Sequence, residues 1–359
     1  MYKEKRNILL TGLLFLQIAL VELASRHSDF VEAYYSRGIY PHISQSLRLG
    51  MGWLKVSIGD LIYLFLIVLL VRFFYIMIRR KGGWRSLIFR LGASVSVFYF
   101  LFYFFWGLNY SRKPVSEDLG LVTGKFDIEK VEQLTTRILK RTAYLHSQLS
   151  SGDSLPVVIP HSKEQIMRLT PAGYARLSEH FDQYAYSTPS IKNSLFSLPL
   201  TYMGFAGYLN PLTGEAQVDG LIPKVSLPLT CSHEVAHQLG IAYENEANFV
   251  GFLAASVHED PFFNYAAMLF ALRYALIDIR RYDKELFQAY AEKIPEGVRA
   301  NLKEIDEFWQ SYQNPFEPIF KSFYDHYLKY NQQKDGLETY NQIVELLISF
   351  DQTYDLDIY

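Results

Sequence analysis

Cysteine is almost absent from this sequence, because Cys231 is the only one among 359 residues. A chain with one cysteine forms no intrachain disulfide and has no pair of thiolates for a CxxC metal site. Any metal ion must therefore be held by histidine and carboxylate side chains. Since no paired base accompanies Cys231, we interpret it as a small buried hydrophobe rather than a nucleophile.

Net charge is also nearly absent. The 35 lysines and arginines are balanced by 37 aspartates and glutamates, which gives a formal net charge of -2. No global basic field attracts nucleic acid, so we expect no nucleic-acid partner. Hydrophobic residues make up 50% of the chain and charged residues 20%. This mixture is typical of a membrane module followed by a globular domain.

Long apolar runs are missing after residue 108. Before it there are three, at about residues 8–24, 58–78 and 88–108, each close to the roughly 20 residues that cross a hydrocarbon core. The first run could instead be a signal peptide, but no clear small-residue cleavage site follows it. The sequence therefore predicts a transmembrane module over residues 1–114, with the lipid bilayer as a partner.

Positive charge predicts the orientation of this module. The short connection after the second run is dense in Lys and Arg, namely Arg79, Arg80, Lys81, Arg85 and Arg90. Such a loop is typical of the cytoplasmic side. The N-terminus is then cytoplasmic as well, because two crossings separate it from this loop. We expect a multi-pass protein of the cell membrane with residues 115–359 extracytoplasmic, and periplasmic in a Gram-negative cell.

Residues 115–359 have the pattern of an α+β, mostly helical domain. Helical periodicity covers 127–148 and 162–184. A short buried strand is expected at 156–160, and extended chain at 194–218 with a hairpin turn at 210–214. Beyond Pro228 the pattern is one helix after another.

The residues His233-Glu234-Val235-Ala236-His237 form an H-E-x-x-H motif. On a helix, positions i and i+4 share a face, so both imidazoles can reach one metal ion. Zinc accepts neutral imidazole and keeps one position for water at catalytic sites. Glu234 could then act as general base and afterwards as proton donor to the leaving amine.

The helix that carries the motif has signals at both ends. Thr230 and Ser232 offer N-cap chemistry before the first histidine, and Gly240 is expected to stop the helix after the second. Val235 and Ala236 are expected on the opposite, buried face.

A third metal ligand must come from outside the motif. The metzincin pattern requires histidine three residues after Gly240, where this chain has Tyr243. A following carboxylate is the other option. We favour Glu246, because it begins a new amphipathic run, and keep Glu244 as the alternative. Asn248 could orient one of the ligands.

Two further roles have weaker sequence signals. The segment 215–218 follows the hairpin turn and is the candidate edge strand for binding an extended substrate. A second electrophile beside the metal would stabilise transition-state charge. Four residues could serve, although a packing or surface role fits each: Tyr243, His258, Arg273 and Tyr340.

The stretch SHEVAHQLGIAYENEANFVGFLA resembles the signature of an uncharacterised family of bacterial membrane proteins with a predicted gluzincin-type peptidase domain. The layout is similar too, with three N-terminal spans that end in Trp106–Tyr110, and with a C-terminal region resembling Tyr327 to Tyr340. The resemblance implies a zincin-like domain, zinc bound by His233, His237 and a glutamate of the Glu-Ala-Asn segment, and Glu234 as the catalytic residue.

Two functions remain compatible with these residues. The first is a membrane-anchored zinc metallopeptidase that acts on a peptide or protein substrate near the membrane or in the cell envelope. The second is a non-catalytic zinc-binding envelope receptor or assembly factor on the same scaffold. The presence of Glu234 favours catalysis, since a binding module needs no general base. Cleavage within the bilayer is disfavoured, because polar residues flank the motif.

Overall fold

The computed structural model describes the whole chain except residues 1, 80–82, 123, 125, 332–341 and 355–359. The chain divides into two compact units, here called the N-terminal unit and the C-terminal unit. The N-terminal unit comprises residues 1–113 with the hairpin tip 210–215, and the C-terminal unit comprises 114–209 and 216–359. Arg80, Lys81 and Tyr340, named above, lie outside the described residues.

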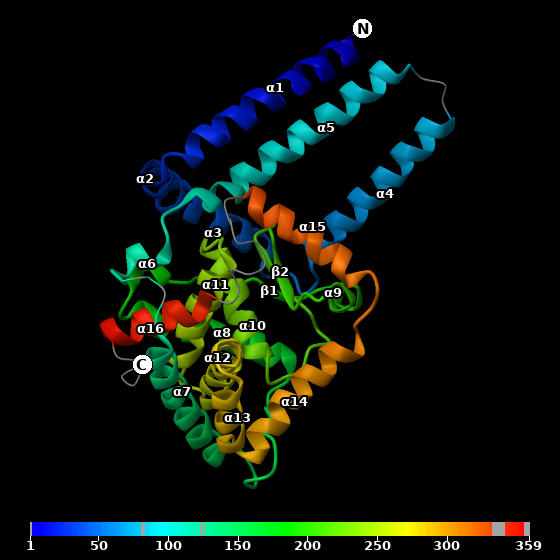
Figure 1. The fold of residues 1–359 in the computed structure, drawn as a ribbon. Helices are drawn as coiled ribbons and strands as arrows, with labels where there is room; N and C mark the ends of the chain where they lie inside the picture. The colour runs from blue at the N-terminus through cyan, green and yellow to red at the C-terminus, as the bar shows by residue number, and fades with distance from the viewer. Residues whose placement is uncertain (1, 80–82, 123, 125, 332–341, 355–359) are drawn as a thin grey trace. The chain divides into compact units, whose positions relative to one another are not determined.

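The N-terminal unit contains three long apolar helices, α1 (Tyr2–Ser25), α4 (Ile58–Arg79) and α5 (Trp84–Phe105). Helices α1 and α5 pack side by side (Figure 1). A Cβ at Gly92 of α5 would lie 2.6 Å from Thr11 Cγ2 of α1, so glycine permits this close approach. Shorter helices complete the unit: α2 (Ser28–Phe30), the π-helix η1 (Val31–Ile39), α3 (Tyr40–Met51) and the 3-10 helix η2 (Gly107–Ser111).

The three apolar runs thus lie on helices of membrane-spanning length. The third helix ends at Phe105 rather than near residue 108, because Trp106 leaves helical geometry with φ -157°. A fourth helix, α12 (Pro261–Tyr282), is also long and apolar enough to cross a membrane, which corrects the expectation that no such segment follows residue 108. Its apolar window is 61% buried within the protein, compared with 0, 6 and 17% for the other three.

The C-terminal unit is mostly helical and contains one small sheet. Its first half holds α6 (Val115–Asp118), α7 (Ile128–Leu149), α8 (Lys163–Ser178), η3 (Asp182–Tyr184), β1 (Ile191–Asn193), α9 (Ser197–Met203), β2 (Gly207–Asn210) and β3 (Glu215–Val218). Its second half holds α10 (Leu227–Gln238), α11 (Glu244–Ser256), α12, α13 (Lys284–Lys293), α14 (Glu296–Ser311), α15 (Glu317–Tyr330) and α16 (Ile343–Tyr354).

Sequence signals account for several of these boundaries. Asp127 caps α7 by accepting the Lys130 N–H, and Ser162 with Gln165 forms a capping box on α8. The expected strand at 156–160 is absent, because Val157 exchanges its backbone hydrogen bonds with the side chain of Asn301 instead of a strand. The expected extended segment 194–218 is interrupted by α9, although the hairpin turn after Asn210 is confirmed.

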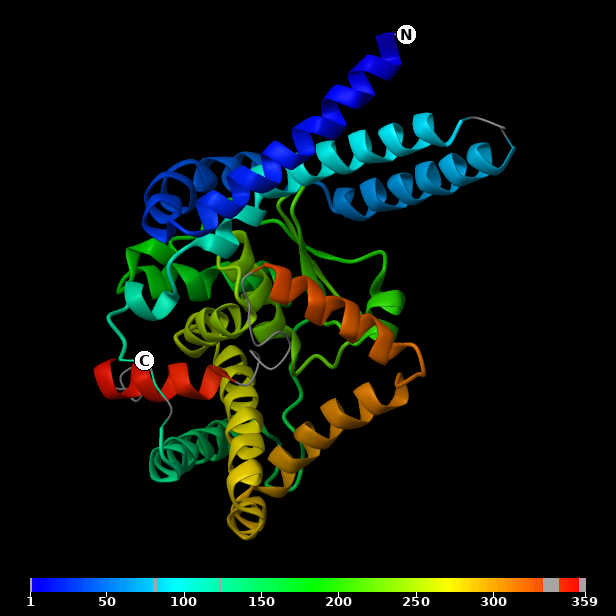
Figure 2. The same ribbon diagram turned by 45° about the horizontal axis from the view of Figure 1, so that its top comes forward.

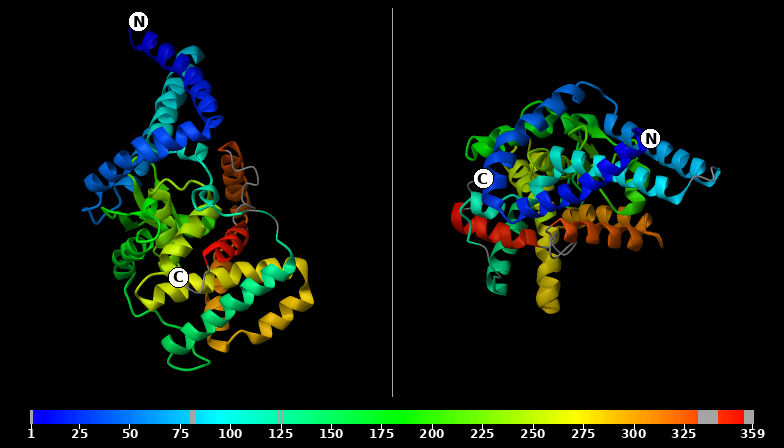
Figure 3. Two further views of the ribbon diagram at one scale, coloured as in Figure 1. Left: turned by 90° about the vertical axis from the view of Figure 1, so that its left-hand side faces the viewer. Right: turned by 90° about the horizontal axis from the view of Figure 1, so that it is seen from above.

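The core of the C-terminal unit lies around α10, α11 and α12. Helix α11 is buried along its whole length between α10, α8, α12 and α16. Glycine allows two of these contacts: a Cβ at Gly251 would lie 2.8 Å from His233 N, and one at Gly173 would collide with Ala254 O. Helices α7 and α12 of the same unit run side by side (Figure 3). The motif helix is therefore a central element.

Candidate metal centre

Helix α10 carries the H-E-x-x-H residues and is longer than expected. It begins at Leu227, with Pro228 in its first turn, where the missing N–H of proline costs nothing. Thr230 and Ser232 are therefore inside the helix, and their hydroxyls donate to carbonyls four residues earlier instead of capping. Gly240, with φ +84°, ends the helix as expected.

Three side chains of the C-terminal unit converge beside this helix. His233 Nε2 lies 3.2 Å from Glu244 Oε2, and His237 Nε2 lies 3.6 Å from the same oxygen. One ligand atom from each residue lies within 4.8 Å of the others. Two ligands bound at 2.0–2.1 Å in a tetrahedral zinc site are separated by about 3.4 Å. The observed separations therefore fit the donor set of one metal ion.

A hydrogen bond at Nδ1 of His237 determines which ring nitrogen is free to bind a metal ion. Its Nδ1 lies 2.7 Å from Ile241 O, and a carbonyl oxygen can only accept, so Nδ1 carries the hydrogen. In the neutral ring, the lone pair is then on Nε2, which faces Glu244. A backbone carbonyl on the other ring nitrogen is the usual partner of a metal-bound histidine.

The charges of His237 and Glu244 depend on each other. Burial opposes the charged form of His237, but the Glu244 carboxylate outweighs burial and raises the pKa of His237 to about 9. Burial alone would raise the pKa of Glu244, yet the imidazoles of His237 and His233 hold it well below its usual range. A carboxylate that stabilises positive charge on the His237 imidazole is also a ligand suited to a divalent cation.

The preference for Glu246 as the third ligand does not match this geometry. Helix α11 begins at Glu244, and residues two apart on a helix point about 200° away from each other. Only one of the two carboxylates can therefore face the imidazoles. The structure brings Glu244 to them, while Glu246 Oε1 accepts the backbone N–H of Val115 at 2.9 Å. The alternative residue thus completes the group.

Glu234 lies next to this group and is 3% exposed. Burial raises the pKa of Glu234 to about 7, although the imidazoles of His233 and His237 favour its ionised form. Its Oε2 atom is buried and has no hydrogen-bond partner in the described part of the chain. Its Oε1 atom lies against strand β2, where a Cβ at Gly207 would come within 2.5 Å of it.

Strand β3 does not have the edge position expected for residues 215–218. The sheet order is β1-β3-β2, so β3 is central, and it pairs in parallel with β1 through Ile191 and Ala216. Strand β2 is an edge strand of the described sheet, and it is the strand that contacts Glu234. The correction arises because β1, three residues long, has too weak a pattern to be recognised in the sequence.

Of the four candidate electrophiles, His258 and Arg273 have partners other than the converging residues. His258 stacks on Phe263 and contacts Leu169 O, and Arg273 pairs with Asp306. Tyr243 precedes α11, where burial and the nearby Glu246 raise its pKa to about 12. Tyr340 lies outside the described residues. The buried Cys231, whose pKa burial raises, fits its interpretation as a hydrophobe.

Two residues at the centre had no sequence signal. Tyr324 of α15 donates its hydroxyl to Glu244 Oε1 at 2.6 Å. Gly207 of β2 makes room for Glu234. Both reach the centre from segments far from the motif in sequence, and no spacing rule connects them to it.

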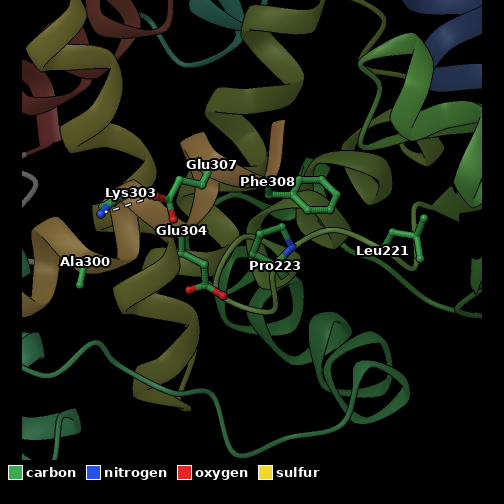
Figure 4. A pocket seen from close by; sticks show the side chains of 7 residues that line it. All are labelled: Leu221, Pro223, Ala300, Lys303, Glu304, Glu307 and Phe308. Atoms are coloured by element: carbon green, nitrogen blue, oxygen red, sulfur yellow. Dashed lines mark ion pairs between the residues drawn. The ribbon is translucent and has the colours of Figure 1, made fainter. Parts of the chain in front are cut away.

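The concave surface drawn in Figure 4 lies elsewhere in the C-terminal unit. It is formed by the loop after β3 and by α14, and its lining residues are Leu221, Pro223, Ala300, Lys303, Glu304, Glu307 and Phe308. Lys303 pairs with Glu307 across one helical turn. None of the converging residues lines it, so this surface is separate from the candidate metal centre.

Comparison with known proteins gives one match. No curated protein and no solved structure matches the chain. A family model described as a protein of unknown function, DUF3810, matches residues 35–348 and so covers both the second and third apolar helices and the H-E-x-x-H helix. The chain therefore belongs to the DUF3810 family.

Proposed function

We propose that the C-terminal unit is a zincin-like, zinc-dependent metallopeptidase domain that hydrolyses peptide bonds and is anchored in the cell membrane. The observation that carries this proposal is the convergence of His233, His237 and Glu244, with Glu234 beside them. Two imidazoles and one carboxylate are the donor set of catalytic zinc sites in several peptidases, where the fourth position is left to water. A gluzincin-type ligand set, with glutamate as third ligand, follows from the same residues.

Each residue then has a defined task. A zinc ion bound here supplies Lewis acidity, which lowers the pKa of a water molecule and polarises a carbonyl oxygen. Glu234 would take the proton of the attacking water and deliver it to the leaving amine. Its Oε2 has no hydrogen-bond partner among the described residues and is available for this proton. Strand β2, which lies against Glu234, is the edge along which an extended substrate could bind.

The membrane anchor is proposed to consist of α1, α4 and α5. These three helices are almost entirely unburied, whereas α12 is mostly covered by its own unit. The basic residues in and beside the connection of α4 and α5 favour a cytoplasmic position for it: Arg79, Arg80, Lys81, Arg85 and Arg90. The N-terminus would then be cytoplasmic and the C-terminal unit extracytoplasmic, facing peptide or protein substrates of the cell envelope close to the membrane.

The experiment uses the full-length chain in detergent, with zinc content measured by mass spectrometry and hydrolysis measured on a peptide mixture. We expect Glu234→Gln to keep zinc and lose hydrolysis, and His233→Ala to lose both. Hydrolysis that persists in Glu234→Gln would contradict its role as base. Zinc bound by the unchanged chain without any hydrolysis would favour the non-catalytic receptor or assembly factor.

A further inference from the structure

Helix α15 has large apolar side chains on its exposed face. Phe316, which precedes the helix, is 65% exposed, Ile319 is 64%, Phe323 is 77% and Tyr330 is 63%. At 100° per residue, these four positions fall within an arc of about 60°. They lie in one line, here called the α15 stripe, along a helix of about 21 Å. Exposed apolar surface of this extent marks a binding site.

Several residues outside the stripe have partners within the chain. Leu328 is fully buried and Tyr324 contacts Glu244, so this side packs onto the C-terminal unit. The charged residues of α15 form pairs at i and i+4, Lys321 with Glu317 and Lys329 with Asp325, away from the stripe. Figure 2 shows α15 as a rod that follows α14 at the edge of its unit. A helix with aromatic residues on one face and charged residues on another can lie in the interface plane of a membrane.

The segment between α5 and Pro114 is short. Helix α5 ends at Phe105, and the C-terminal unit begins at Pro114. Residues 106–113 span at most about 28 Å when fully extended. If α5 crosses the bilayer, the C-terminal unit is held permanently close to the lipid surface. A lipid interface is then present at high effective concentration, whereas a soluble partner would have to be captured.

We propose that the α15 stripe is a lipid-docking surface, with Phe316, Ile319, Phe323 and Tyr330 inserted into the interfacial layer of the bilayer that anchors the chain. Phenylalanine and tyrosine are suited to this layer, because their rings are apolar and the tyrosine hydroxyl reaches the headgroups. The inference rests on the proposed membrane anchoring but not on zinc. Since Tyr324 follows Phe323, lipid contact would also hold α15 over the metal centre.

The test uses the full-length chain in phosphatidylcholine–phosphatidylglycerol vesicles and a bimane label on single introduced cysteines. Cys231 is buried and stays in place. Phe323→Cys and Ile319→Cys report on the stripe. Phe65→Cys in α4, 61% exposed in the native chain, is the control for anchoring, and Tyr144→Cys in α7, 55% exposed, is the control for a surface without lipid. Lipids carrying a nitroxide near the headgroup quench labels that contact the bilayer.

We expect quenching at least threefold stronger at residues 319, 323 and 65 than at 144. Strong quenching at 65 with equal, weak quenching at 323 and 144 would overturn lipid docking while leaving the anchor intact. Weak quenching at all positions would overturn the anchor as well. A label at 323 that is shielded from aqueous iodide but not quenched by lipid would assign the stripe to a protein surface, either a partner or a second copy, and would also overturn the proposal.

Discussion

Tyr324 and Glu244 are 80 residues apart in the sequence, yet the tyrosine hydroxyl donates a hydrogen bond of 2.6 Å to Glu244 Oε1. The other carboxylate oxygen, Oε2, is the one that faces His233 and His237. The two oxygens are therefore divided between a supporting hydrogen bond and the candidate metal. Residues that hold a ligand in this way commonly change metal affinity when they are replaced.

We expect Tyr324→Phe to weaken zinc binding by about tenfold, because Glu244 loses the bond that fixes its orientation. The measurement is a competition between the full-length protein and a chromogenic chelator. Tyr330→Phe is the matched control, since Tyr330 lies on the same helix and is 63% exposed. Equal affinities in both variants would mean that Tyr324 does not position the ligand.

The pair Glu244→Gln and Glu246→Gln distinguishes the two possible third ligands. We expect Glu244→Gln to lower zinc affinity by more than about a hundredfold, because a ligand matters more than the groups that support it. Glu246→Gln should keep zinc and cost about 1 kcal/mol of stability, since its hydrogen bond to Val115 N loses its charge. The opposite result would restore Glu246 as the ligand.

The comparison of these two glutamates also shows what the sequence can predict. Local spacing identifies His233, Glu234 and His237, because a helix fixes the relation of i and i+4. Local spacing cannot predict how the next helix is rotated about its own axis, because that rotation depends on how Phe249 and its neighbours are buried. The contact of Glu246 with Val115 joins residues 131 positions apart, and no local pattern contains it.

For secondary structure too, local features could be predicted and features that depend on tertiary contacts could not. Local signals correctly placed the Asp127 cap, the Ser162 capping box and the end of α10 at Gly240. The apolar segment 156–160 predicts a strand, because its central residues are β-branched. A tertiary partner, Asn301, satisfies that backbone instead. The family resemblance is confirmed only as membership of DUF3810, and the peptidase activity stays a prediction.

Gly207→Ala tests the contact between β2 and Glu234. An added Cβ would lie 2.5 Å from Glu234 Oε1 and 2.7 Å from the backbone oxygen of Gln217, so β2 or Glu234 must move. A displacement of about 1 Å at a catalytic group can cost about a hundredfold in rate. We expect hydrolysis to fall at least tenfold while zinc stays bound. Gly152→Ala, whose new Cβ would meet its nearest neighbour at 3.6 Å, should leave hydrolysis unchanged.

Asp278 of α12 predicts a pH dependence of stability that is separate from the metal centre. Burial raises its pKa from 3.8 to about 6, the nearby Glu345 adds to the shift, and Arg281 opposes it. Between pH 4 and pH 6 the folded chain binds more protons at this site than the unfolded chain. The free energy of unfolding therefore falls as pH rises through this window. Above it, the destabilisation caused by the buried, ionised carboxylate is complete.

Asp278→Asn should remove this destabilisation. We expect a gain of about 1–2 kcal/mol at pH 8 and none at pH 4. The change in pKa from 3.8 to about 6 already includes the opposing effect of Arg281 and corresponds to about 3 kcal/mol, and solvent screening around this partly buried carboxyl group reduces that figure. Thermal unfolding of the full chain in detergent at both pH values measures it. Arg281→Gln should change the free energy of unfolding in the opposite direction, lowering it at pH 8 but not at pH 4. A gain in Asp278→Asn that is equal at both pH values would show that side-chain packing, rather than the buried charge, sets the stability at this position.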